Sequence, residues 1–72
     1  MSITKMMILE RGLQHIEKEL DAERKAAEKL DRIRGINEVI SARNYKMMYI
    51  AQLEQIRRQI REQIDEIKAE GA

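Results

Sequence analysis

The chain has 72 residues and a formal net charge of +1, and a single domain of this size (residues 1–72) buries only about 60% of the surface that its unfolded chain exposes. It contains no cysteine, which excludes disulfides and cysteine-ligated zinc and leaves association with another chain as the remaining way to stabilise so small a fold. Without proline and with few aromatic residues, but rich in helix formers, the composition excludes a β protein and predicts an all-α protein with long helices.

The first predicted element is a helix over about residues 3–34. Its apolar residues recur at spacings of three and four, the heptad pattern of a helix that packs against another along one seam. The predicted seam consists of Met6, Leu9, Leu13, Ile16, Leu20, Glu23, Ala27 and Leu30. Gly12 lies inside this helix and costs it about 1 kcal/mol relative to alanine. It is either a tolerated defect or a place where another backbone approaches closely.

The heptad of the first helix loses its phase between Ile33 and Ile36. Continued beyond Leu30, the same row would fall on mostly polar residues, which argues against one uninterrupted helix. Gly35 lies at the break and Asn37 follows it, residue types that favour the end of one helix and the start of the next. The sequence therefore predicts a turn at about residues 35–37 and an antiparallel helical hairpin.

The second predicted helix covers about residues 38–70. Its apolar stripe consists of Ile36, Ile40, Met47, Ile50, Leu53, Ile56, Ile60, Ile64 and Ile67. From Leu53 onwards the spacing is three, four, four and three. This spacing departs from a strict heptad and predicts little supercoiling.

The register of the hairpin has two alternatives. With a tight turn, facing residues have numbers that sum to about 73, which pairs Leu20 with Leu53 and Leu13 with Ile60. A sum of about 80 also pairs apolar residues, but it needs a loop of about ten residues, and such long connections are uncommon. We therefore favour the tight turn.

Apolar residues outside the seam predict self-association. Two helices in contact along one seam leave the other sides exposed, and a second hairpin packed there would form a four-helix bundle or a larger helical assembly. Gln52, Gln55, Gln59 and Gln63 form a stripe that either borders such an interface or faces solvent. The residues that we expect to contact a second copy or another protein are Met7, Tyr45, Met48, Tyr49, Ile56, Ile60 and Ile64.

The sequence contains no pattern that is typical of an enzyme. His15 is the single histidine, and neither a zinc-protease motif nor the Glu-x-x-His pair of di-iron bundles is present. There is also no glycine-rich phosphate loop and no plausible nucleophile with an adjacent base. We predict a protein without catalytic activity, metal or cofactor, in which His15 lies at the surface or in an interface.

Positive charge collects in the middle of the chain. Residues 24–46 carry a net charge of +4, whereas residues 1–23 carry −2 and residues 47–72 carry −1. At the tip of the hairpin, Arg32, Arg34, Arg43 and Lys46 would gather beside the free N–H groups of the second helix. This cluster either keeps the tip soluble or binds the phosphates of a nucleotide or nucleic acid.

The leading functional prediction is a non-enzymatic helical protein that associates with itself and binds another protein. Such proteins act as regulators, inhibitors or assembly factors, and they include proteins encoded by phages and plasmids. The alternative is nucleic-acid or nucleotide binding through the basic tip. The longest apolar run, Met6 to Leu9, is far shorter than a membrane span of about 20 residues. No secretion signal is evident, so we expect no membrane partner and a cytoplasmic location.

Overall fold

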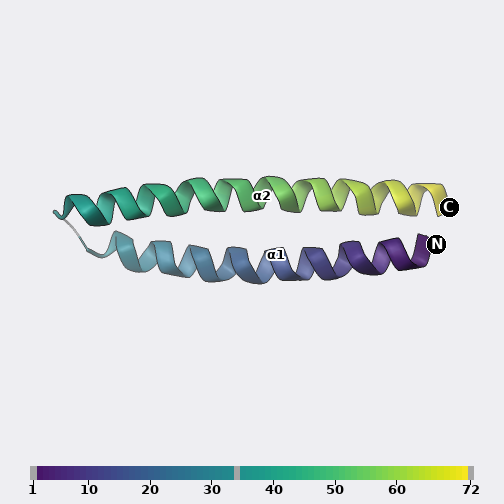
Figure 1. The fold of residues 1–72 in the computed structure, drawn as a ribbon, viewed down its shortest axis with the longest axis horizontal. Coiled ribbons are helices and arrows are strands. Elements are labelled where there is room, and N and C mark those ends of the chain that lie inside the picture. Colours follow the sequence, from purple (N-terminus) through teal and green to yellow (C-terminus); the bar gives the residue numbers. More distant parts are fainter. Residues whose placement is uncertain (1, 34, 72) are drawn as a thin grey trace.

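Two long helices make up nearly all of the structure, a computed structural model that describes the backbone of residues 2–33 and 35–71 and the side chains of residues 4–33 and 35–71. The helices α1 (Ser2–Asp31) and α2 (Asn37–Gly71) run antiparallel and side by side (Figure 1). The rod measures 54 × 14 × 14 Å. No strand occurs in the described residues. The prediction of an all-α helical hairpin is therefore confirmed.

The connection between the helices is short, because α1 ends at Asp31 and α2 begins at Asn37. The N–H groups of Arg32 and Ile33 donate to the carbonyl oxygens of Lys29 and Leu30, so the last turn of α1 tightens and the helix ends at Asp31 rather than near residue 34. Gly35 has a φ of +83°, a left-handed conformation that glycine adopts without a steric penalty. The short connection leaves no room for the long loop of the second register.

The predicted seam of α1 is confirmed along its whole length. Each of the positions from Met6 to Leu30 that the heptad selects is buried or half-buried. Leu20 and Ala27 are buried, and they form the core with Ile50 and Leu53 of α2. Ile16 packs against this cluster from one side.

The seam of α2 differs from the predicted stripe and is a strict heptad. Its buried and half-buried positions are Val39, Arg43, Lys46, Ile50, Leu53, Arg57, Ile60, Ile64 and Ile67. The prediction was wrong for four members of the stripe, Ile36, Ile40, Met47 and Ile56, which are exposed. Arginine and lysine occupy the seam because their long apolar stems pack inside while their charged heads reach out to carboxylates or water.

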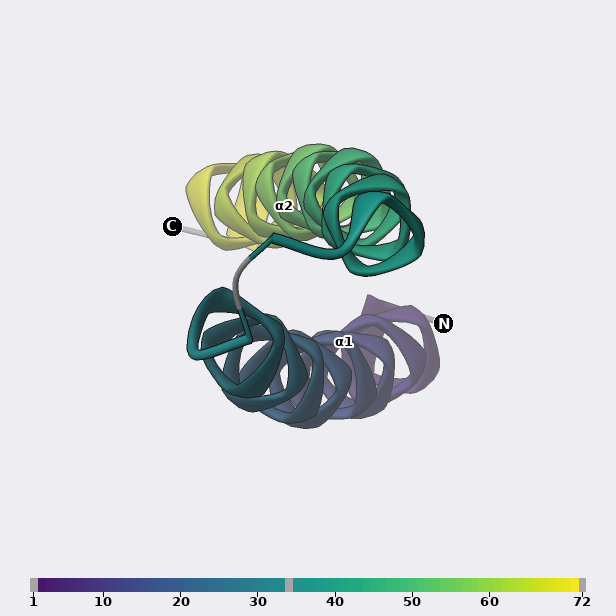
Figure 2. The ribbon, with the colours of Figure 1, turned by 90° about the vertical axis from the view of Figure 1, so that its left-hand side faces the viewer.

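Contacts between the helices agree with the register in which facing residues have numbers that sum to about 73. A Cβ atom added to Gly12 would lie 3.8 Å from Cδ1 of Ile60, so these two positions face each other. Polar pairs lie on both sides of the seam: Glu19 with Tyr49 on one side, and Glu17 with Arg61 on the other. Seen from the tip, the helices cross at a shallow angle (Figure 2), as helices with heptad seams do.

Candidate protein-binding surface

Exposed apolar side chains gather near the turn. Of the ten large apolar side chains that are exposed in the described part of the chain, seven lie between residues 33 and 49, which we call the tip segment. They are Ile33, Ile36, Ile40, Tyr45, Met47, Met48 and Tyr49. Water-exposed apolar groups concentrated in one region mark a contact surface more often than scattered ones do.

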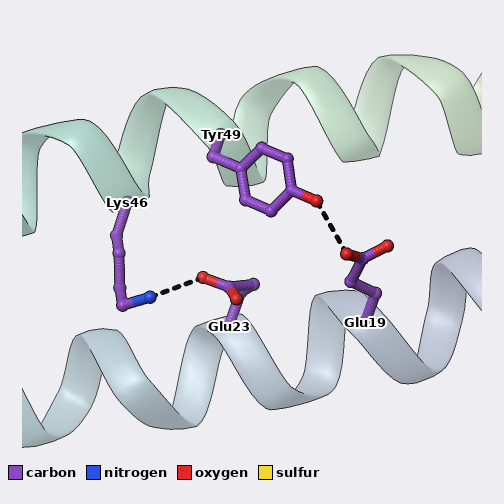
Figure 3. A network of polar contacts seen from close by, with 4 residues as sticks. All are labelled: Glu19, Glu23, Lys46 and Tyr49. Atoms are coloured by element: carbon purple, nitrogen blue, oxygen red, sulfur yellow. Dashed lines mark hydrogen bonds and ion pairs between the residues drawn. The ribbon is translucent and has the colours of Figure 1, made fainter.

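The seam beneath the tip segment is polar. The amino group of Lys46 donates to the carboxylate of Glu23 at 2.8 Å, and both residues occupy seam positions (Figure 3). Closer to the turn, Arg43 forms an ion pair with Asp31. Farther from the turn, by contrast, the seam is formed by apolar residues such as Leu13 and Ile64. In the tip segment, therefore, Arg43 and Lys46 share the seam with Val39, whereas the large apolar side chains lie outside it.

The surface of the tip segment contains two shallow hollows. The tip hollow, of about 290 Å³, has walls formed mainly by apolar residues close to the turn. They are Leu30, Asp31, Ile33, Gly35, Val39, Ile40 and Arg43. The outer hollow, of about 390 Å³, lies on the solvent side of α2 and is lined by Ser41, Asn44, Tyr45 and Met48. Both are open depressions into which a partner's side chains can fit.

Tyr49 connects the two helices at the edge of the tip segment. Its hydroxyl donates to a carboxylate oxygen of Glu19 at 2.7 Å (Figure 3). This hydrogen bond raises the pKa of Tyr49 above its ordinary value of 10.0, and the negative charges of Glu19 and Glu23 add to the shift because they oppose a phenolate. Nε2 of His15, one turn earlier on α1, lies 3.9 Å from the other oxygen of Glu19.

The basic residues that we predicted at the tip do not form a free cationic cluster. Arg43 and Lys46 each pair with a carboxylate of α1, so their charge is largely compensated within the chain. Arg32 is exposed, and Arg34 lies outside the described residues. A second basic group, Arg57, Arg58 and Arg61, lines a hollow together with Glu54, Glu62 and Asp65, which compensate its charge.

The predicted contact residues divide into two groups. Met7, Tyr45, Met48, Tyr49 and Ile56 are exposed and available to a partner. Ile60 is half-buried and Ile64 is buried, because both belong to the seam within the chain, so they do not contribute to the outer surface. Sequence reasoning missed the exposure of Ile33, Ile36, Ile40 and Met47, since their spacing is also that of a helix core.

The described residues hold no cluster of metal ligands, since no three His, Asp or Glu side chains among them lie close enough to hold a metal ion. Neither described helix contains an apolar stretch long enough to cross a membrane. Comparisons of the chain with protein-family models, curated protein sequences and solved structures find no match.

Proposed function

We propose that the protein is a non-enzymatic interaction module of the cytoplasm, a helical hairpin that associates with itself and binds another protein as a regulator, inhibitor or assembly factor. The observation that carries this proposal is the distribution of side chains in the tip segment. Apolar residues that would stabilise a hairpin if they lay in its seam instead face outwards, and paired charges take their place. An outer apolar surface gains free energy when a partner covers it, by about 25 cal/mol per Å² of buried apolar area.

The small core supports the same proposal. Five apolar side chains are buried in the described part of the chain: Leu20, Ala27, Ile50, Leu53 and Ile64. Such a core offsets little of the conformational entropy that 72 residues lose on folding. Association with a second copy buries further apolar surface and adds the missing stability.

A protein partner fits the tip better than a nucleic acid does. Nucleic-acid binding depends mainly on cations that are free to neutralise phosphates. Here Arg43 and Lys46 are engaged by Asp31 and Glu23, and breaking those pairs would reduce the gain from binding a phosphate. Ile40 and Met48, in contrast, are free to enter an apolar contact.

Capture of partners from cells that express the protein tests the proposal. The bait is the hairpin, and the comparison is a variant with Ile40→Glu and Met48→Glu in the tip segment. The matched control carries Ala51→Glu and Gln55→Glu, two exposed positions on α2 beyond that segment. We expect a protein that survives nuclease treatment and high salt, is retained by the control bait, and is lost from the tip variant.

Two results would contradict the proposal. A ligand that disappears on nuclease treatment, or whose affinity falls steeply with salt, would indicate a nucleic acid in place of a protein. In sedimentation equilibrium, a folded monomer at micromolar concentration would refute self-association.

A further inference from the structure

The two sides that flank the seam differ in charge. On one side, which we call the Arg61 face, Glu17 pairs with Arg61 at 3.1 Å and Arg24 with Glu54 at 3.8 Å. On the other, the Tyr49 face, Glu19 accepts the hydrogen bond from Tyr49. Because residues seven apart share one position of a heptad, each face can be followed along both helices.

The Tyr49 face carries fewer charges than the Arg61 face. Three of its nine flanking residues are charged, and two of these three lie near the chain ends: Lys5, Gly12, Glu19, Ala26, Ala42, Tyr49, Ile56, Gln63 and Glu70. On the Arg61 face seven of the nine corresponding residues are charged: Glu10, Glu17, Arg24, Asp31, Ile40, Met47, Glu54, Arg61 and Lys68. Charged side chains are depleted from the centres of protein interfaces, which favours the Tyr49 face as the contact surface. The carboxylate of Glu19, in the middle of this face, already accepts a hydrogen bond from Tyr49, so covering it costs less.

Gly12 supplies a second, independent observation. It lies within α1 at a flanking position of the Tyr49 face, where glycine weakens a helix. The space around it does not require glycine, because an added Cβ would meet Cδ1 of Ile60 at 3.8 Å, an ordinary van der Waals distance. Packing within the hairpin therefore does not explain this residue. Close approach of a second chain does, since a bare backbone lets another helix come nearer.

The charge along the rod determines how two copies would be oriented. The tip region, residues 24–46, carries +4, and the remaining segments carry −2 and −1. Two copies with their tips at the same end would bring the two positive regions together. Two copies with their tips at opposite ends place each positive region beside a negative one, an arrangement that a two-fold axis across the rod generates.

The size of the rod also suits such a dimer. A face of 54 × 14 Å has a projected area of about 750 Å², which gives room for the roughly 800 Å² of accessible surface that each partner buries in a stable interface. We propose that two copies pack through their Tyr49 faces with their tips at opposite ends, forming a symmetric four-helix bundle. This inference rests on the self-association proposed above. It leaves the tip hollow uncovered, because Asp31 and Ile40 in its wall belong to the Arg61 face.

A matched pair of substitutions tests which face is used. Ile56 on the Tyr49 face and Met47 on the Arg61 face have nearly equal exposure, 41% and 44%. We expect Ile56→Glu to weaken the dimer at least tenfold in sedimentation equilibrium and Met47→Glu to leave it nearly unchanged. We also expect Gly12→Ala to weaken the dimer, although alanine favours the helix. The reverse order for the two glutamate variants, or a tighter dimer with Gly12→Ala, would overturn the choice of face.

Distances between spin labels test the same dimer without the glutamate substitutions, which could prevent folding. The chain has no cysteine, so single cysteines can be placed at will. Labels at Gln52, on the side of Tyr49, should lie within about 20 Å of each other in the dimer, and labels at Ala51, on the opposite side, should lie farther apart. Labels at Ser41, about 20 Å from the middle of α2, should be separated by about 40 Å or more along the bundle.

Each outcome bears on a distinct statement. Ser41 labels within about 20 Å of each other would show tips at the same end and overturn the orientation. Ala51 labels closer than Gln52 labels would overturn the face. Both results would leave self-association intact. A chain that stays monomeric at micromolar concentration would refute the proposed self-association, and this inference with it.

Discussion

The pair of Glu23 and Lys46 offers the sharpest test of how the seam is stabilised. Both residues occupy heptad positions between the helices, with side-chain exposures of 23% and 33%. Two unit charges about 4 Å apart attract by about 4 kcal/mol at an effective dielectric constant of about 20. Partial removal from water offsets much of this attraction. Because hydrogen bonds between charged groups contribute about 1.5–3 kcal/mol net, we expect a coupling free energy near the lower limit, about 1.5 kcal/mol.

A double-mutant cycle measures this coupling. The variants are Glu23→Ala, Lys46→Ala and the double variant, and their free energies of unfolding come from urea titrations followed by circular dichroism. All samples need the same chain concentration, because self-association adds a concentration-dependent contribution to stability.

The chain contains a matched control for this cycle. Asp21 and Lys25 form an ion pair at 3.1 Å on the surface of α1, with exposures of 68% and 71%. Such exposed pairs on one helix contribute about 0.3–0.5 kcal/mol. A coupling between Glu23 and Lys46 no larger than that between Asp21 and Lys25 would refute the reasoning, since the seam position would then add nothing.

Three further predictions concern the core, the turn and the pH dependence. Leu20 is 1% exposed, so Leu20→Ala should lower the free energy of unfolding by about 2–4 kcal/mol; an equal effect of Ile8→Ala, at an exposed position, would contradict this. Gly35→Ala should lower the free energy of unfolding by about 1–2 kcal/mol because φ is +83° there, whereas Gly71→Ala, without such strain, should not destabilise the hairpin. Equal urea midpoints for the two variants would argue against the turn geometry. Because the pKa of Tyr49 is raised, the stabilisation from its neutral hydroxyl is complete below pH 10.0 and is lost as the pH rises through the higher folded pKa. With Tyr45→Phe as background, ultraviolet titration of Tyr49 should show a lower midpoint after Glu19→Gln, and an unchanged midpoint would exclude Glu19 as the cause.

The first helix and the turn could be predicted because their signals are local. The seam of α1 is apolar apart from Glu23, and Gly35 coincides with the loss of phase. The seam of α2 could not be predicted in the same way, because Arg43 and Lys46 lie in it and form ion pairs with carboxylates on α1. Periodicity assigns charged residues to solvent, so it selected Ile40 and Met47 in place of the true seam residues.

The candidate surface, too, could be predicted from the sequence only in part. The exposure of Tyr45 and Met48 could be predicted, since they lie outside any apolar row. The exposure of Ile40 and Met47 in the tip segment, with Arg43 and Lys46 in the seam, could not be predicted. It depends on which residues of α1 face which residues of α2. Once the register is known, the ion pairs of Arg43 and Lys46 explain why the neighbouring isoleucines remain outside.

The start of α1 and the end of α2 lie at the same end of the rod, opposite the turn (Figure 1). A pulling force applied through the two ends therefore acts across the seam and separates facing residues one pair after another. The seam residues nearest the free ends, Met6 and Ile67, would separate first, and the pair of Glu23 and Lys46 would break only after more than half of α1 had been peeled away. A load applied along the helices in opposite directions would instead be shared by the whole seam. Pulled through its two ends, the hairpin would therefore open progressively and at low force, and the helices would separate last at the turn.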